Sequence, residues 1–392
     1  MKSVKAVFVG IVTCICAIRV ANATDAMKPV ALPPAEGTVV GAAFSPDNSR
    51  LAVIRHVTGA GSSGAGSSAN QHVLQIVDLK SGRETSRAEI LSGEPADLAS
   101  TAHLAAYSSD GRYLLIATQG SDVLSIMNAT SLHAVKQFAL HPEPESRRSL
   151  AEGHRYFRGV VSLSVASKAG IFAVMTHDEL QGNEVFVGSF ASETITNNWS
   201  LGRGRSATQL GEISLSLSDD GSRVAVSVLP DGNSLPKNFQ NLRLYDTGSG
   251  HEVKSIRTHG LIGPIVLLSG EDVAASRIDT PGLFSKKPCI EIWNFNTGAL
   301  GRQFCDSGRT VSVALAVSHT AGRVVGFASQ IRKSIEGQVY SASGRIDVWD
   351  MKSGDVVASS QEISRLVSHP QVSANGEWVL ADQTLFQIGS AR

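Results

Sequence analysis

One short pattern recurs along the chain and constrains its fold more than any other feature. Residues 345–359 read RIDVWDMKSGDVVAS: an apolar strand, a turn closed by Gly354 and a returning strand. This order predicts a β-hairpin, because alternating apolar residues on both sides of a glycine-containing turn are its usual signature. Related phrases begin at His72, Asn241 and Cys289. Repetition of one hairpin along a chain indicates a repeat architecture.

A second type of hairpin alternates with the first. It consists of an apolar strand, a tight turn of Ser, Asp, Asn or Gly, and another apolar strand. Seven such pairs recur at a pitch of about 50 to 60 residues, and they begin at Val39, Leu104, Val161, Ile213, Ile265, Val313 and His369. Helical periodicity is scarce. Two hairpins make one four-stranded unit, so the sequence predicts an all-β chain of such units.

These units resemble the repeats of the WD-repeat and WD-like β-propeller family over nearly all of the chain beyond residue 23. The residues that carry the resemblance are Phe44-Ser45-Pro46-Asp47, Ser109-Asp110-Gly111, Ser218-Asp219-Asp220-Gly221, Trp293-Asn294 with Thr297-Gly298, and Trp349-Asp350 with Ser353-Gly354. The family's Gly-His pair is matched only loosely, at Gly153-His154, and its Trp-Asp pair is intact once. The resemblance implies a ring of seven four-stranded blades. Six or eight blades are the alternatives, because the unit around Val185 is irregular.

The two ends of the chain are expected to meet in the last blade. The final unit has three predicted strands before the chain stops, so it lacks an outer strand. Residues 28–33 form a short apolar run that has no other partner. In WD-like propellers an N-terminal strand completes the last blade and removes its open edge. We therefore predict that residues 28–33 close the ring, with a simple linker as the alternative.

Residues 1–23 have the features of a secretory signal peptide. Two lysines precede an apolar run of 13 residues, and Ala21-Asn22-Ala23 has the small-x-small pattern of a cleavage site. The run is short against the roughly 20 residues that span a bilayer. An uncleaved membrane anchor and a lipid attached to Cys14 are the alternatives. We expect residues 24–392 to form the mature domain, a protein without a transmembrane segment in the periplasm or the extracellular space.

Charge and cysteine content agree with export. The chain has 35 basic and 35 acidic residues, and loss of residues 1–23 leaves a net charge of −3, so no global field for nucleic acid is present. Cys289 and Cys305, the two cysteines beyond residue 23, flank one predicted turn. In an oxidising compartment they could form a disulfide, with buried free thiols as the alternative. No C-x-x-C or matching histidine pair accompanies them, so no metal site is expected there.

The predicted connections differ between the two faces of the ring. With strands labelled a to d from the axis outward, the a-to-b and c-to-d turns share one face and are short. The b-to-c and d-to-a connections share the other face and hold the insertions, at residues 58–71, 141–159, 229–241, 276–288 and 329–344. Insertions confined to one face usually mark the binding face.

The candidate binding residues lie in these insertions. Aromatic residues beside arginines are frequent contact residues in interfaces. The candidates are Arg147, Arg148, His154, Arg155, Tyr156, Phe157, Arg158, Phe284, Lys286, Lys287, Arg332, Lys333 and Tyr340. Ordinary solvated loop charge is the alternative. Residues 58–71 are rich in Gly and Ser and carry no side chains suited to chemistry.

Two functions are compatible with this pattern. The favoured one is a non-catalytic, monomeric platform that binds a protein, a peptide or a component of the cell envelope and needs no cofactor. The alternative is a secreted hydrolase or lyase, with or without a metal, at the mouth of the central channel. His56, His177 and Asp178, with His154, are its candidate ligands or bases, although their spacing does not require them to converge. The propeller fold supports both functions, so the fold does not decide between them.

Overall fold

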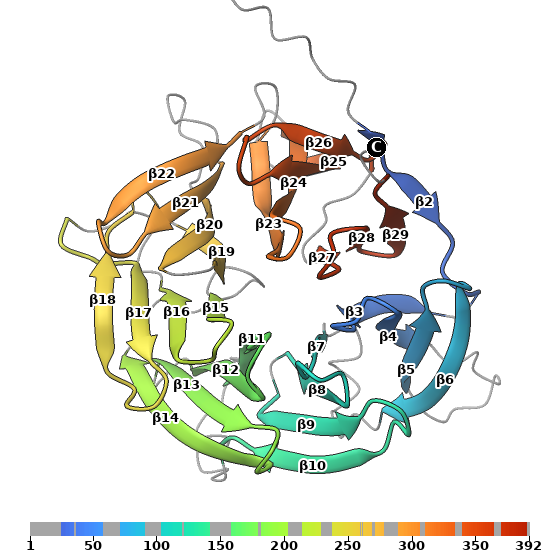
Figure 1. Ribbon diagram of the computed structural model, residues 1–392, viewed down its shortest axis with the longest axis horizontal. Coiled ribbons are helices and arrows are strands. Elements are labelled where there is room, and N and C mark those ends of the chain that lie inside the picture. Colours follow the sequence, from blue (N-terminus) through green and yellow to red (C-terminus); the bar gives the residue numbers. More distant parts are fainter. Residues whose placement is uncertain are drawn as a thin grey trace, which may run out of the picture.

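The structure is a computed structural model that describes residues 25–34, 37–57, 71–90, 103–119, 121–141, 158–178, 182–202, 214–228, 237–258, 260, 262–268, 271–277, 289–305, 310–333, 339–363 and 370–389. These residues form seven sheets arranged as blades around a central axis (Figure 1). All the regular elements among them are β-strands. The seven-bladed all-β propeller predicted from the sequence is confirmed.

Each blade is an antiparallel sheet whose first strand lies nearest the axis. Blade 1 contains β3 (Thr38–Phe44), β4 (Arg50–Val57), β5 (Gln71–Asp78) and β6 (Arg83–Ile90). Blade 2 contains β7 (His103–Tyr107), β8 (Tyr113–Thr118), β9 (Val123–Asn128) and β10 (Ala134–Ala139). Blade 3 contains β11 (Arg158–Val165), β12 (Ile171–Asp178), β13 (Gly182–Ser189) and β14 (Thr194–Gly202).

The remaining blades follow the same order. Blade 4 contains β15 (Ser214–Leu217), β16 (Arg223–Ser227), β17 (Leu242–Asp246) and β18 (Glu252–Ile256). Blade 5 contains β19 (Ile262–Leu267), β20 (Asp272–Arg277), β21 (Ile290–Asn294) and β22 (Ala299–Phe304). Blade 6 contains β23 (Thr310–Ser318), β24 (Arg323–Lys333), β25 (Val339–Asp350) and β26 (Val356–Ser359). Blade 7 contains β27 (Gln371–Val372), β28 (Trp378–Ala381) and β29 (Thr384–Gln387).

The N-terminal segment closes the ring. β2 (Lys28–Val30) pairs antiparallel with β29 and supplies the outer strand of blade 7, as predicted. β1 (Asp25–Ala26), which the sequence did not predict, adds to β26 of blade 6 in parallel. Between these strands the N–H of Met27 donates to the carbonyl of Ser359 over 3.0 Å, and the Met27 side chain is buried. The segment therefore ties blade 6 to blade 7.

Serine and a carboxylate or amide shape the a-to-b turns. In blade 1, Ser45 Oγ donates to Asp47 Oδ1 at 2.5 Å and accepts from the N–H of Arg50 at 2.9 Å. The same two bonds recur in blades 2, 4 and 7, around Ser108, Ser218 and Ser373. The repeated Ser-x-Asp/Asn phrase specifies this turn, because its side chains satisfy backbone and side-chain donors locally.

A different device shapes the c-to-d turns. The side chain that ends strand c accepts the N–H of the residue three positions later, at 2.6 to 2.9 Å, and the acceptors are Asp78, Asn128, Asp246, Asn294 and Asp350. In most of these turns the next residue is a glycine with positive φ, such as Gly354 at 80°. Blade 3 lacks this phrase, and Glu193 adopts the left-handed conformation instead (φ 53°). Its hairpin therefore forms despite the irregular sequence.

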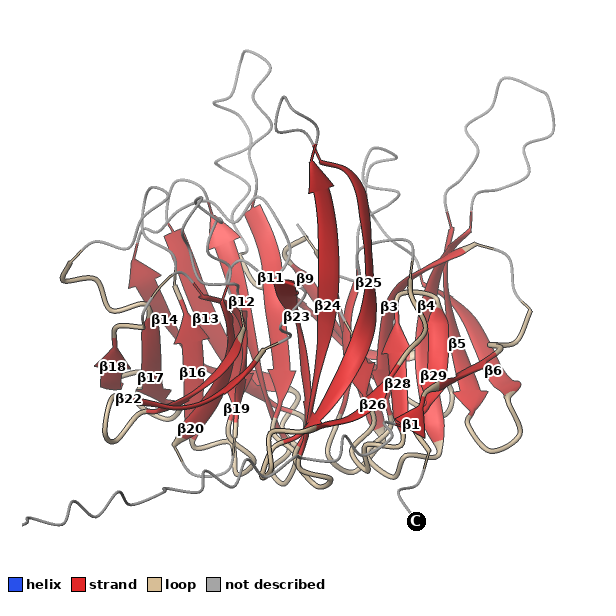
Figure 2. Cartoon of the chain, turned by 90° about the horizontal axis from the view of Figure 1, so that it is seen from above, coloured by secondary structure: helices blue, strands red, loops and turns tan. Residues whose placement is uncertain are grey.

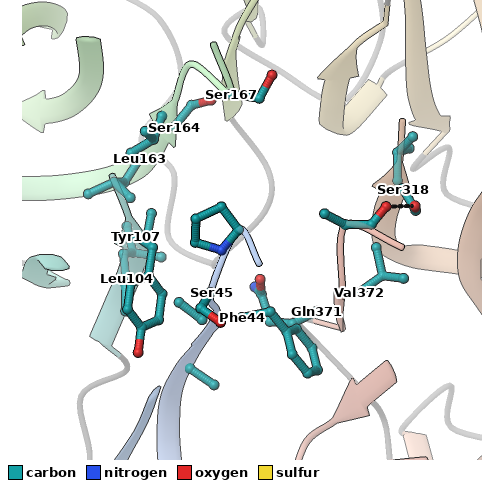
Figure 3. A pocket seen from close by; sticks show the side chains of 18 of the residues that line it. Phe44, Ser45, Leu104, Tyr107, Leu163, Ser164, Ser167, Ser318, Gln371 and Val372 are labelled. Carbon is teal, nitrogen blue, oxygen red and sulfur yellow. Dashed lines mark hydrogen bonds between the residues drawn. The ribbon is translucent and has the colours of Figure 1, made fainter. Parts of the chain in front are cut away.

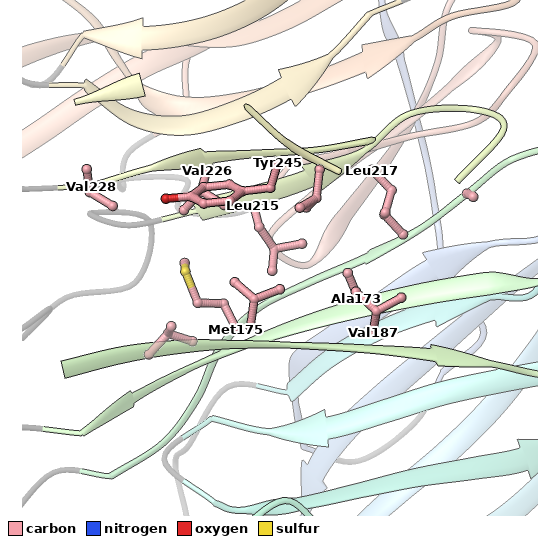
Figure 4. Packing of buried hydrophobic residues seen from close by; sticks show 12 residues of the cluster. Ala173, Met175, Val187, Leu215, Leu217, Val226, Val228 and Tyr245 are labelled. Carbon is pink, nitrogen blue, oxygen red and sulfur yellow. The ribbon is translucent and has the colours of Figure 1, made fainter. Parts of the chain in front are cut away.

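The hydrophobic core lies between blades. Apolar residues on the facing sides of adjacent blades interdigitate, as Figure 4 shows for blades 3 and 4. There Ala173, Met175 and Val187 of blade 3 meet Leu215 and Val226 of blade 4, and all five are buried.

No helix that could cross a bilayer occurs among the described residues.

Candidate functional site

The two faces of the ring differ in the length of their connections. On one face, called here the short-turn face, four or five residues separate the strands joined by each a-to-b or c-to-d turn. On the other, the long-connection face, 13 residues separate β4 from β5, 18 separate β10 from β11 and 14 separate β16 from β17. Extra chain has therefore accumulated on one face, as the sequence indicated.

One hairpin projects from the long-connection face. β24 and β25 extend beyond the neighbouring strands on this side (Figure 2). Their register is continuous from Arg323 opposite Asp350 to Arg332 opposite Ser341, and Lys333 pairs with Val339. Residues 329–344, which the sequence analysis assigned to an insertion, thus mainly prolong two strands of blade 6. We call this projection the blade 6 arm.

The predicted binding residues fall into two groups. Arg158 begins β11, Arg332 and Lys333 end β24, and Tyr340 lies at the start of β25, so the last three belong to the blade 6 arm. The others lie outside the described residues: Arg147, Arg148, His154, Arg155, Tyr156, Phe157, Phe284, Lys286 and Lys287. The predicted signal peptide, residues 1–23, also lies outside them.

The predicted disulfide is present. Cys289 and Cys305 are bonded, and their Cα atoms are 4.8 Å apart. The two residues flank β21 and β22 at the ends that reach the long-connection face. The bond therefore fixes two adjoining strand ends on the face that carries the long connections.

The histidines proposed as metal ligands lie apart. His56 is in blade 1, where its Nδ1 lies 3.3 Å from His72 Nε2. His177 is in blade 3, where its Nδ1 lies 2.8 Å from Asn183 Oδ1, and Asp178 follows it at the end of β12. Blade 2 separates the two positions. Within the described parts of the chain, no group of three or more His, Cys, Asp or Glu side chains is arranged to hold a metal ion.

A cavity of about 890 Å³ occupies the centre of the ring (Figure 3). Its volume is within the range of roughly 300 to 1,000 Å³ that is typical of small-molecule sites. β3 and β7 line it along most of their length, where the small residues Gly41 to Ala43, Ala105 and Ala106 leave space. Larger apolar side chains complete the wall, among them Phe44, Leu104, Leu163, Val317 and Val372.

Several serines of the inner strands join blades to one another. Ser162 Oγ and Ser164 Oγ, in blade 3, each accept a backbone N–H of blade 4 at 3.0 Å. Ser216 Oγ, in blade 4, accepts the N–H of Leu267 in blade 5 at 2.9 Å. These inner-strand serines thus have a structural role, because their hydroxyls satisfy backbone donors of the adjacent blade.

A polar group lies at the short-turn mouth of the cavity. Asp219 in blade 4 accepts from Ser167 Oγ at 2.6 Å and pairs with Lys168 Nζ at 3.1 Å, and His319 of blade 6 also lines this mouth. Burial acts to raise the pKa of Asp219, but the hydrogen bonds from Ser167 and Lys168, together with the charges of His319 and Lys168, outweigh it, so the net pKa is lowered. Asp219 is therefore an ionised, hydrogen-bonded carboxylate.

Sequence reasoning placed the alternative enzyme site at a mouth of the central channel, but it did not identify the residues of this mouth or the partner of His56. The contact between His56 and His72 could have been predicted from the sequence. A hairpin of β4 and β5 that turns about residue 64 places the two histidines opposite each other. No local sequence pattern predicts the residues of the mouth. Lys168, Asp219 and His319 belong to three blades and come together only when the ring closes. No protein-family model matches the sequence, and the search of curated proteins found no significant match.

Proposed function

We propose that the protein is an exported propeller of the WD-like type that binds a protein, a peptide or an envelope polymer through its long-connection face. The observation that carries this proposal is the asymmetry of the ring. Turns of four or five residues on one face contrast with connections of up to 18 residues and the blade 6 arm on the other. A connection that is longer than needed to join two strands more often contributes to binding than to folding.

The residue types in the sequence of this face support the same proposal. Arg332 and Lys333 end the first strand of the blade 6 arm and Tyr340 lies in the second. The connection before β11 ends in Arg155, Tyr156 and Phe157, and Arg158 follows as the first residue of β11. Tyrosine and arginine dominate the energetically important residues of protein interfaces. An acidic or aromatic-rich partner surface would complement them.

Export is part of this proposal. The N-terminal segment has the pattern of a cleaved signal, and the disulfide fits an oxidising compartment. N-terminal sequencing of protein recovered from the periplasm or the medium should give Thr24 as the first residue. Intact Met1 in membrane-bound protein would show an uncleaved anchor instead.

Face-specific substitutions test the binding function. A partner is first captured from envelope extract, purified and identified, and its dissociation constant is then measured. Replacing Tyr156 and Phe157 by Ala should weaken binding by about 2 kcal/mol or more, with the melting temperature nearly unchanged. The matched control is Lys80→Ala with Lys352→Ala, because both lysines are exposed on the short-turn face. Equal losses in both variants, at the same salt concentration, would refute the assignment of the face.

A second candidate function is chemistry on a small molecule in the central cavity. The observation that favours it is the Ser167, Lys168, Asp219 and His319 group at one mouth of an 890 Å³ cavity. This function would be established if the wild-type protein hydrolyses ester or glycoside substrates. Asp219→Asn should abolish the hydrolysis, and the variant with Tyr156 and Phe157 replaced by Ala should retain it. Without such turnover in the wild-type protein, this candidate fails.

A further inference from the structure

Three histidine side chains meet in the seam between blades 1 and 2. His56 Nδ1 and His72 Nε2 are 3.3 Å apart, and the ring centroids of His72 and His103 are 4.4 Å apart in an edge-to-face arrangement. The three residues come from β4, β5 and β7, and their exposed fractions are 8%, 2% and 4%. All three lie at the strand ends that reach the long-connection face.

The packing around His103 is tight. A Cβ atom on Gly41 of β3 would lie 2.5 Å from the His103 carbonyl oxygen, so only glycine allows this approach of blade 1 to blade 2. His103 Nδ1 lies 3.2 Å from Thr118 Oγ1 of β8. Its Nε2 is buried and has no hydrogen-bond partner among the described residues. The His103 imidazole therefore fits the closed seam, but none of the described groups there accepts a hydrogen bond from a second ring N–H.

The described groups that face His103 are neutral or basic. The ionisable groups that act on His103 are the imidazoles of His72 and His56. Arg55 precedes His56 in β4 and points to the other side of that strand, where its Nε donates to Gln75 Oε1 at 2.9 Å. Thr118, on β8, carries no charge. Addition of a proton would thus place a buried cation beside two further imidazoles, which is a costly arrangement.

We propose that His103, packed against His56 and His72, forms a pH-sensitive latch that holds blades 1 and 2 together while its imidazole is neutral and opens their seam at mildly acidic pH. The latch acts on the ring itself and does not depend on the proposed binding function. Opening would expose the His103 imidazole to water, where it can bind a proton without the desolvation penalty. β4 and β6 end on the long-connection face of blade 1, so opening of the seam would move the strand ends from which two connections begin.

The direction follows from the pKa of His103. Burial, reinforced by His72 and His56, lowers this pKa to about 3 from the model-peptide value of 6.5. Between about pH 6.5 and pH 3 the His103 imidazole is protonated in the opened seam but remains neutral in the closed seam. Acid therefore favours opening. The closing equilibrium constant should fall about tenfold per pH unit between about pH 6 and pH 3, and about 30-fold between pH 8 and pH 5.

Hydrogen exchange measured by mass spectrometry tests the latch. Protection factors of peptides from β4, β5 and β7 are compared at pH 8 and pH 5, after correction for the pH dependence of chemical exchange. We expect a fall of about 30-fold in these peptides. The seam of blades 4 and 5, where Ser216 contacts Leu267, is the internal control and should change little. A uniform response of both seams, or none, would overturn the proposal without any variant.

Two variants make the test specific. His103→Gln removes the titrating ring and should abolish the pH response of the blade 1 and 2 peptides. His319→Gln removes a histidine at the short-turn mouth of the cavity and should leave the response intact. Should His103→Gln fail to fold, His56→Gln probes the same cluster from its most exposed member and should reduce the response. A wild-type response in folded His103→Gln or His56→Gln would refute the latch.

Discussion

Met27→Ala should weaken closure of the ring more than any other single side-chain truncation in the N-terminal segment. Met27 is 2% exposed and belongs to one buried cluster with Val325 and Ile346 of blade 6 and Phe386 of blade 7. It sits between β1, which adds to blade 6, and β2, which completes blade 7. Its side chain is therefore the apolar contact of this segment that is shared by both blades.

The size of the effect follows from this burial. Truncation of a buried Met to Ala typically costs about 2 to 5 kcal/mol. This cost is the sum of the lost transfer free energy of the removed atoms and the free energy of the cavity that remains. The main-chain bond from Met27 to Ser359 remains possible in the variant. We expect a loss of about 3 kcal/mol in the free energy of unfolding. Deletion of residues 25–30 should cost more, since blade 7 would then expose an open edge.

Equilibrium urea unfolding, followed by tryptophan fluorescence, measures this loss. The control is Lys28→Ala, which removes an exposed side chain from β2 and should change stability by less than about 0.5 kcal/mol. A Met27→Ala protein as stable as the wild type would refute the reasoning. So would an equal loss in Lys28→Ala, because burial of the Met27 side chain would then not account for the effect.

Three further predictions concern local devices. Cys289→Ser should lower the free energy of unfolding by about 3 kcal/mol in oxidising buffer and by little in reductant, because the bond closes a loop of about 16 residues. Gly188→Ala should destabilise by about 1 to 3 kcal/mol, since its Cβ would lie 2.2 Å from Phe172, whereas Gly170→Ala, with open space around it, is the near-neutral control in the same melts. Hydrogen bonds from neighbouring serines lower the pKa of Asp220 to about 2, so its stabilisation is present above pH 3.8 and lost toward pH 2. Acid unfolding of Asp220→Asn beside the wild type should show a difference that disappears near pH 2.

The sequence predicted those parts of the fold that depend on local chemistry. Ser45 and Asp47 form their turn with donors five residues away or fewer, and Asn294 forms its own in the same way. Such turns can be read in a linear chain because every participant is close in sequence. Closure of blade 7 was also predictable, since a blade with three strands requires a fourth.

Contacts between blades were the part that sequence reasoning missed. His103 meets His72, and Asp219 meets Lys168, only after neighbouring sheets have packed at a definite height along the axis. Strand periodicity sets which side a residue faces, but it does not set that height. β1 was missed for a related reason, because two residues are too few to show an alternating pattern.

The inner strands show why residue type alone misleads in a propeller. Serines near a central cavity suggest nucleophiles, but Ser164 and Ser216 accept main-chain N–H groups of the next blade. Replacing either hydroxyl would leave a buried donor unsatisfied, which costs about 1 to 3 kcal/mol. These hydroxyls of the inner strands therefore stabilise the packing of adjacent blades, and they are not available as nucleophiles.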